Sequence, residues 1–220
     1  KISSEFDING NYVRCENIEF LYDGWTKREW DDYGSVTPED VPANKKPELF
    51  GVGDELYRCL IHDTMGIGWW SSSINSKLTE CIIFNNGYVE YGDKGHGHGI
   101  YTQNTSGLKT VERCIIFFNY GWGVKLQGSD AYSGYYFKDC IFFDPSLPDD
   151  GLGGMSQSLV MGGWEQYSNI IVEGCEFYNR ASLASGTARS MDIGYSGGLD
   201  NFQILNNYCC ATTYFSTYPL

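Results

Sequence analysis

Several features that would identify a common class of protein are scarce in this sequence. Only 6 residues are proline and only 3 are histidine. No apolar run approaches the ~20 residues that a membrane-spanning helix requires. Basic residues number 15 against 28 acidic ones, which gives a net charge of −13. This balance leaves no basic stripe for a nucleic acid and no attraction to an anionic membrane. The sequence therefore predicts neither a nucleic-acid partner nor insertion into a membrane.

Glycine and aromatic residues, in contrast, are abundant. Of 220 residues, 27 are glycine and 17 are tyrosine, and aromatic side chains make up 16% of the chain. Glycine favours tight turns and aromatic residues favour strands. No segment of helical length repeats its apolar residues with a helical period. The composition therefore predicts an all-β fold, and the length fits a single domain over residues 1–220.

Eight cysteines recur along the chain without the CxxC spacing that zinc ribbons use. Most of them open a short apolar segment, as in Cys81-Ile-Ile-Phe84 and Cys114-Ile-Ile-Phe117. Their intervals fall in the range of about 20–50 residues that is typical of solenoid repeats. We expect reduced cysteines that are buried as small apolar side chains. Disulfides between neighbouring repeats are the alternative, although stacked parallel strands give them poor geometry.

A second short strand precedes each cysteine strand, as in Gly99-Ile-Tyr-Thr102 and Gly123-Val-Lys-Leu126. Repeats of two or three strands without a helix predict a right-handed parallel β-helix of about 6–7 coils stacked ~4.8 Å apart. Equivalent residues of successive coils then form rows along the axis. The expected inward rows are Ile67, Ile100, Val124, Leu159 and Met191, and, two residues on, Trp69, Thr102, Leu126, Met161 and Ile193.

Three runs carry a resemblance to a known group of proteins: residues 61–70, residues 81–87 and the glycine- and histidine-rich run 95–104. They resemble the bacterial and phage right-handed parallel β-helix repeat proteins of the pectate-lyase-like and tailspike-like superfamily. The resemblance covers about residues 55–210. It implies a β-helix that is secreted, on a cell surface or in a virion. Because that superfamily holds lyases, hydrolases, epimerases and non-catalytic adhesion proteins, it implies no single activity. The calcium-binding aspartates and arginine base of pectate lyases have no match here.

Two stretches interrupt the repeats. Residues 21–55 form a long acid-rich insertion and residues 145–157 a surface loop. The insertion lacks a DxDxDG-like calcium loop, so no cofactor is expected, with calcium as the alternative. The chain begins at Lys1 rather than Met, and no amphipathic segment covers either end. We therefore expect a processed protein, an excised domain or a fragment, with a homotrimer or partner domains at the open β-helix ends.

The outward positions of the second strand define a candidate sugar-binding surface. Alternation along the strands places aromatic, amide and charged side chains on one exposed face. Aromatic faces suit the CH faces of sugar rings, and polar groups suit their hydroxyls. Ordinary solvated strand residues are the alternative. The expected binding residues are Trp70, Gln103, Gln127, Trp122 and Asp192, with Tyr101 and Lys125 between them.

All three histidines, His62, His96 and His98, fall in two neighbouring repeats. They are expected either to form a cluster near this surface or to serve as turn residues among Gly95, Gly97 and Gly99. If the protein is an enzyme, β-elimination at a uronate is the expected reaction. His98 or Lys125 would then take the C5 proton, Lys125 would neutralise the carboxylate, and Tyr101 would protonate the leaving oxygen.

The sequence thus predicts an extracellular, carbohydrate-binding β-helix whose partner is a polysaccharide. A polysaccharide lyase or hydrolase is one form that this function takes. The alternative is a non-catalytic β-helix of a phage tailspike, fibre or surface adhesin, with a structural or receptor-binding role.

Overall fold

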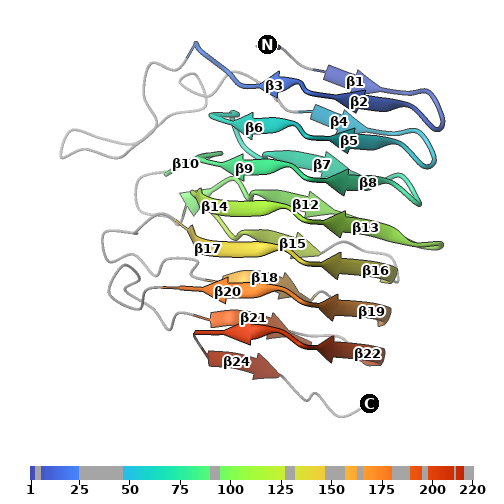
Figure 1. Ribbon diagram of the computed structural model, residues 1–220, viewed down its shortest axis with the longest axis vertical. Helices are drawn as coiled ribbons and strands as arrows, with labels where there is room; N and C mark the ends of the chain where they lie inside the picture. The colour runs from blue at the N-terminus through green and yellow to red at the C-terminus, as the bar shows by residue number, and fades with distance from the viewer. Residues whose placement is uncertain are drawn as a thin grey trace.

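The computed structural model describes residues 1–2, 6–24, 47–89, 95–126, 132–146, 157–162, 166–179, 189–194, 198–210 and 212–215. Within these ranges the secondary structure consists of strands and turns and includes no helix. The strands form a stack of coils that runs from one end of the molecule to the other in chain order (Figure 1). No helix among the described residues is long and apolar enough to cross a membrane.

Three parallel sheets make up the stack; each of the first seven coils gives one strand to each sheet, and β24 adds an eighth strand to sheet 1. Sheet 1 consists of β1 (Phe6–Ile8), β4 (Pro47–Leu49), β7 (Trp69–Ser71), β12 (Ile100–Thr102), β15 (Val124–Leu126), β18 (Gln157–Met161), β21 (Arg189–Ile193) and β24 (Thr212–Phe215). Sheet 2 consists of β2 (Arg14–Glu16), β5 (Glu55–Tyr57), β8 (Lys77–Thr79), β13 (Lys109–Glu112), β16 (Tyr132–Lys138), β19 (Tyr167–Glu173) and β22 (Leu199–Leu205). Sheet 3 consists of β3 (Glu19–Phe20), β6 (Leu60–His62), β9 (Ile82–Phe84), β14 (Ile115–Asn119), β17 (Ile141–Ser146), β20 (Glu176–Tyr178) and β23 (Tyr208–Cys209). The predicted parallel β-helix is confirmed.

One small element departs from the coils. Strands β10 (Tyr88–Val89) and β11 (Gly95–His96) pair antiparallel between the third and fourth coils. Two expected loops are shorter than their predicted ranges, because Pro47–Leu49 forms β4 and Gln157 starts β18. Within the two predicted ranges, residues 25–46 and 147–156 lie outside the described residues.

Five of the eight cysteines form a row inside the stack, directly before the strands of sheet 3, whereas Cys15 lies in β2 of sheet 2 and is partly exposed. These five are buried, and all eight are free thiols, as predicted: Cys59, Cys81, Cys114, Cys140 and Cys175 are the buried ones. Burial raises the pKa of the Cys114 thiol well above its ordinary value. Cys209 and Cys210 are exposed instead. In their coil Asn207 follows Cys175 in the row, and its Oδ1 accepts a hydrogen bond from Cys175 N at 2.7 Å.

The first inward row of sheet 1 differs from the prediction by two residues in one coil. Ile100 pairs with Trp69, not with Ile67, and Ser71 pairs with Thr102. Trp69 is fully buried, whereas Ile67 lies in the preceding turn and is partly exposed. Burying an indole removes more apolar surface from water than burying an isoleucine side chain, so Trp69 takes the interior position. The shift is an even number of residues, so Trp70 still faces outward.

Polar groups fill the interior beside Trp69. Lys109 is fully buried at the start of β13, and sequence reasoning did not identify it. Its Nζ donates to Ser71 O at 2.9 Å, Thr102 Oγ1 at 2.8 Å and Gln103 O at 2.7 Å. Burial holds the pKa of Lys109 well below its usual range. Lys109 thus links two neighbouring coils from the inside.

Candidate functional site

The exposed face of sheet 1 carries a row of large side chains in register. Trp70 of β7 pairs with Tyr101 of β12, which pairs with Lys125 of β15. Each is the partly buried middle residue of a three-residue strand whose other two residues are buried. Strand alternation therefore turns all three side chains outward. The two-residue shift in β7 places Trp70 directly beside Tyr101.

The turns that precede β12 and β15 add His98 and Trp122 to this row. The His98 ring stacks on the Trp122 ring with centroids 5.0 Å apart and planes 9° apart. The edge of His98 also meets Tyr101, at 5.9 Å between centroids. Trp122 N donates a hydrogen bond to His98 Nδ1 at 3.0 Å. Because Nδ1 accepts this bond, the neutral ring carries its proton on Nε2.

A glycine makes this stack sterically allowed. A Cβ atom at Gly121 would lie 2.5 Å from His98 Nδ1 and 2.9 Å from Gly97 O. Any larger residue at position 121 would push the imidazole away from Trp122. The Gly-His-Gly-His-Gly run and Gly121-Trp122 therefore act together to hold the histidine against the indole.

Lys125 lies over the aromatic rings of this group. Its Nζ is 4.3 Å from the centroid of Trp122 and 5.7 Å from that of Tyr101. Both distances are within the range of cation–π attraction. Partial burial raises the pKa of Tyr101, and its side-chain hydrogen bond with Gln103 offsets part of that rise. Four side chains, His98, Tyr101, Trp122 and Lys125, thus form one unit, which we call the aromatic–lysine cluster.

Trp70 and a phenylalanine extend the cluster along the sheet. The Phe50 ring lies 5.6 Å from the Trp70 ring, and Glu48 pairs with Trp70 on the next strand. Sequence reasoning missed Phe50 because it assigned residues 21–55 to a loop. The apolar–polar–apolar run Pro47-Glu-Leu49, directly before Phe50, was the signal that could have identified a strand there.

Other predicted site residues lie elsewhere or outside the described residues. Asp192 occupies the same row two strands beyond Lys125, but it is only 3% exposed and bonds to Arg189 Nη1 at 2.5 Å. The structure therefore does not bring Asp192 onto the exposed surface. Gln127 lies outside the described residues, and His96 is described only through its backbone in β11.

His62 lies on a sheet 3 strand, whereas His98 lies in the turn before β12 of sheet 1. The His62 ring, at the end of β6, stacks on Phe84 at 4.9 Å between centroids. Its Nδ1 contacts Asp63 Oδ2 at 2.6 Å and its Nε2 contacts Glu19 Oε1 at 3.2 Å. His62 therefore takes no part in the contact between His98 and Tyr101.

The chemistry available in the cluster is that of aromatic faces beside one cation. Such a surface can stack on the CH faces of a ring and attract a carboxylate. Among the residues that the structure describes, no group of three or more His, Cys, Asp or Glu side chains is placed to hold a metal ion.

Comparison with known proteins yields no relative for this chain. No family model, no curated protein and no solved structure matches it. The resemblance to β-helix repeat proteins is thus supported at the level of the fold, by three parallel sheets. Membership of the pectate-lyase-like and tailspike-like superfamily stays an expectation.

Proposed function

We propose that this protein is an extracellular carbohydrate-binding β-helix whose sugar site is the row Trp70–Tyr101–Lys125 together with His98 and Trp122. The observation that carries this proposal is the pairing of Trp70 with Tyr101 on neighbouring coils, next to a lysine held over two rings. Neighbouring strands are ~4.8 Å apart, so the register sets the two aromatic side chains next to each other on the outward face, where both are available to sugar rings.

Lys125 favours a polysaccharide that carries carboxylates. The ammonium group lies beside the Tyr101 and Trp122 rings, where a carboxylate on a stacked ring would meet it. The net charge of −13 repels a polyanion at long range. Recognition then depends on the local contact with Lys125, and added salt has two opposing effects because it screens both the repulsion and the contact.

The geometry favours binding over β-elimination. The hydrogen bond from Trp122 N occupies the lone pair of His98 Nδ1, so the neutral ring presents a donor at Nε2 rather than a base. Tyr101, with its raised pKa, stays protonated and acts as a donor as well. Two donors and a cation suit sugar hydroxyls and a carboxylate. Removal of the C5 proton would then fall to Lys125, which would first have to lose its own proton.

Titration against a panel of acidic and neutral polysaccharides tests the proposal. Tyr101→Ala should weaken binding of the preferred glycan by about 1–3 kcal/mol, roughly 5- to 150-fold in Kd, as is typical for aromatic anchors. Tyr178→Ala is the matched control, because Tyr178 is an exposed tyrosine on sheet 3. Lys125→Gln should weaken acidic glycans more than neutral ones.

Two results would contradict the proposal. One is that no polysaccharide in the panel binds the wild-type protein. The other is that folded Tyr101→Ala keeps the wild-type affinity. Release of unsaturated uronate by the wild type would instead show that a base exists in the site and would favour the lyase.

A further inference from the structure

The outward row of sheet 1 extends beyond Trp70 toward the start of the chain. Asp7 of β1 pairs with Glu48 of β4, and Glu48 pairs with Trp70 of β7. These strands follow one another along the stack, and β12 and β15 come next (Figure 1). Asp7 is exposed and Glu48 is partly exposed, whereas the residues that follow them, Ile8 and Leu49, are buried. Both carboxylates therefore lie on the same outward face as the aromatic–lysine cluster.

The exposed part of this row has charges of opposite sign at its two ends. The two carboxylates form one end and Lys125 forms the other, with two aromatic side chains between them. Beyond Lys125 the row is buried, since Val160 is 5% exposed and Asp192 is 3% exposed. A ligand that lies along the exposed row therefore meets carboxylates at one end and an ammonium group at the other.

The negative end also offers aromatic faces. The Phe50 ring lies 5.6 Å from the Trp70 ring, with the two planes 56° apart, and Phe50 is 40% exposed. Glu48 is the register neighbour of Trp70. An ammonium group is attracted to aromatic faces by cation–π interaction and to carboxylates by charge-assisted hydrogen bonds. Two carboxylates beside two aromatic rings therefore have the composition of a site for a positively charged amine.

The positive end is suited to a carboxylate. Lys125 Nζ is held 4.3 Å from the centroid of Trp122 and 5.7 Å from that of Tyr101. The two rings keep the ammonium group on the outward face at this end of the row. A carboxylate on a sugar ring that stacks on Tyr101 therefore lies within reach of Lys125.

The spacing of the row fits two successive sugar units. Neighbouring strands are ~4.8 Å apart, so Glu48 and Lys125 are three strand steps or ~14 Å apart. A pyranose unit in an extended glycan is about as long as one strand step. Two successive units that lie along the stack therefore place one ring beside Trp70 and the next beside Tyr101. The substituents of the first ring then face Glu48, and those of the second face Lys125.

We propose that the ligand of this row is a zwitterionic polysaccharide, in which an amino sugar with a free ammonium group alternates with a sugar that carries a carboxylate. The ammonium group binds between Glu48 and the Phe50–Trp70 pair, and the carboxylate binds Lys125. The two charged ends of the row fix which sugar unit lies at which aromatic ring. This inference rests on the proposed sugar site and names the class of its ligand.

The net charge of the protein supports a zwitterion over a polyuronate. At −13 the protein repels a polyanion at long range, whereas a glycan with equal numbers of ammonium and carboxylate groups is not repelled. Binding of the zwitterion then depends on short contacts of both signs. Added salt should therefore weaken this binding, without the opposing gain that a polyuronate obtains when the long-range repulsion is screened.

A matched pair of oligosaccharides tests this ligand class. Hyaluronan alternates a uronate with an N-acetylated amino sugar, and de-N-acetylated hyaluronan has the same backbone with a free amine. Titration calorimetry is carried out at mildly acidic pH, where the amine is protonated. The wild type should bind the de-N-acetylated form at least about fivefold more tightly than the parent, as one added charge-assisted contact implies. Equal affinity, or tighter binding of the parent, would overturn the proposal.

Glu48→Gln separates the two forms by the sign of its effect. It should weaken binding of the de-N-acetylated form about fivefold. It should not weaken binding of the parent, because it removes a carboxylate that repels the uronates of the parent. Glu176→Gln is the matched control, because it removes the same charge from an exposed position on sheet 3. If Glu48→Gln weakens both forms equally, or acts no differently from Glu176→Gln, the ammonium site is wrong.

Tyr101→Ala distinguishes failure of this inference from failure of the sugar site. If another glycan of the panel binds in a Tyr101-dependent way while neither hyaluronan form binds, the sugar site stands and the zwitterionic ligand is wrong. If both forms keep the wild-type affinity after Tyr101→Ala, the glycan lies elsewhere and the proposed sugar site is wrong. Weakening of both forms by Tyr101→Ala, together with a Glu48→Gln effect confined to the amine form, supports both.

Discussion

At the scale of single residues, Lys109 shows how a charged side chain is accommodated inside this β-helix. Its Nζ reaches the carbonyl oxygens of Ser71 and Gln103, and the hydroxyls of Ser71 and Thr102 complete its surroundings. Those acceptors belong to neighbouring coils. One side chain therefore donates hydrogen bonds to buried oxygen atoms for which the apolar rows provide no donor. The nearby Trp69 ring, 5.7 Å away, adds a cation–π contact.

Replacing this lysine should destabilise the fold. Lys109→Met keeps the apolar stem but leaves buried carbonyl and hydroxyl groups without their donor, at a cost of about 2–4 kcal/mol of unfolding free energy. Lys77→Met is the matched control, because Lys77 is exposed on the neighbouring strand β8. Urea denaturation of the two variants measures the difference. Equal stability of Lys109→Met and the wild type would contradict the role assigned to these bonds.

The same residue predicts a pH dependence. Burial lowers the pKa of Lys109 in the folded state, so the unfolded chain binds more protons between that value and the ordinary lysine pKa of about 10.4. The Lys109 contribution to stability should therefore rise with pH in that window. The difference in unfolding free energy between the wild type and Lys109→Met, measured as pH increases from neutral, should grow. A difference in unfolding free energy that does not change with pH would show that burial in the β-helix does not disfavour the ammonium form of Lys109.

At the scale of elements, the turns before the strands of sheet 1 decide which side chains reach the surface. Gly121 and Gly97 bring two turns close enough for His98 to stack on Trp122. The strands then carry Tyr101 and Lys125 outward beside that stack. A substitution confined to a turn should therefore alter the geometry of the proposed sugar site without replacing any side chain that is proposed to contact the sugar.

Gly121→Ala tests this dependence. The added methyl group would meet His98 Nδ1 at 2.5 Å, so the imidazole must leave its stacked position. We expect a loss of glycan affinity of about tenfold, with a stability cost of about 1–2 kcal/mol. Gly66→Ala is the control, because a methyl group added at Gly66 would have no other atom within 4 Å. If both variants bind the glycan equally well, the stack does not shape the site.

Prediction from the sequence succeeded where a pattern repeats and failed where one coil departs from it. The cysteine row and the alternation around Tyr101 and Lys125 recur in successive coils, so the sheets and the outward face could be predicted. The run Gly66-Ile67-Gly68 resembles Gly99-Ile100-Tyr101 at the start of the next repeat. Only the larger side chain of Trp69 indicates that Trp69, and not Ile67, lies inside the stack. Lys109 and Phe50 follow no repeat, so their positions depend on contacts that a single sequence does not display.

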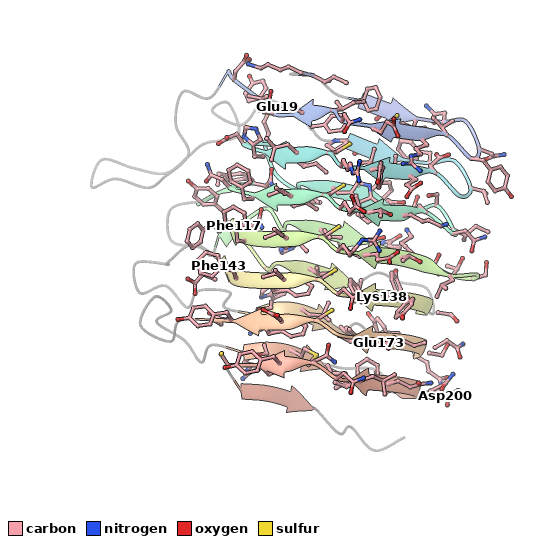
Figure 2. The ribbon with its side chains drawn as sticks, in the orientation of Figure 1. Glu19, Phe117, Lys138, Phe143, Glu173 and Asp200 are labelled. Carbon is pink, nitrogen blue, oxygen red and sulfur yellow. The ribbon has the colours of Figure 1, made fainter. Side chains whose placement is uncertain are left out.

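At the scale of the whole molecule, the three sheets have different outward chemistry. Sheet 1 carries aromatic side chains and a lysine, with Asp7 and Glu48 in the same row, sheet 2 carries mixed charges, and sheet 3 carries aliphatic and aromatic rows. Lys138 and Glu173, on neighbouring strands of sheet 2, illustrate the charged face in Figure 2. Inside, all three sheets contribute to one continuous apolar core. The three faces of the stack therefore differ in the side chains that they present to solvent.

The most direct test of the sugar site uses the indole resonances of the protein. With a glycan selected from the panel, ¹⁵N-labelled protein should show chemical-shift changes for the Trp70 and Trp122 indoles, each assigned through its Trp→Phe variant. The Trp69 indole should not move, because it is fully buried on the opposite side of the same strand from Trp70. Saturation with a bound glycan that leaves both Trp70 and Trp122 unshifted would show that carbohydrate binds elsewhere and would contradict the assignment of sheet 1 as the binding face.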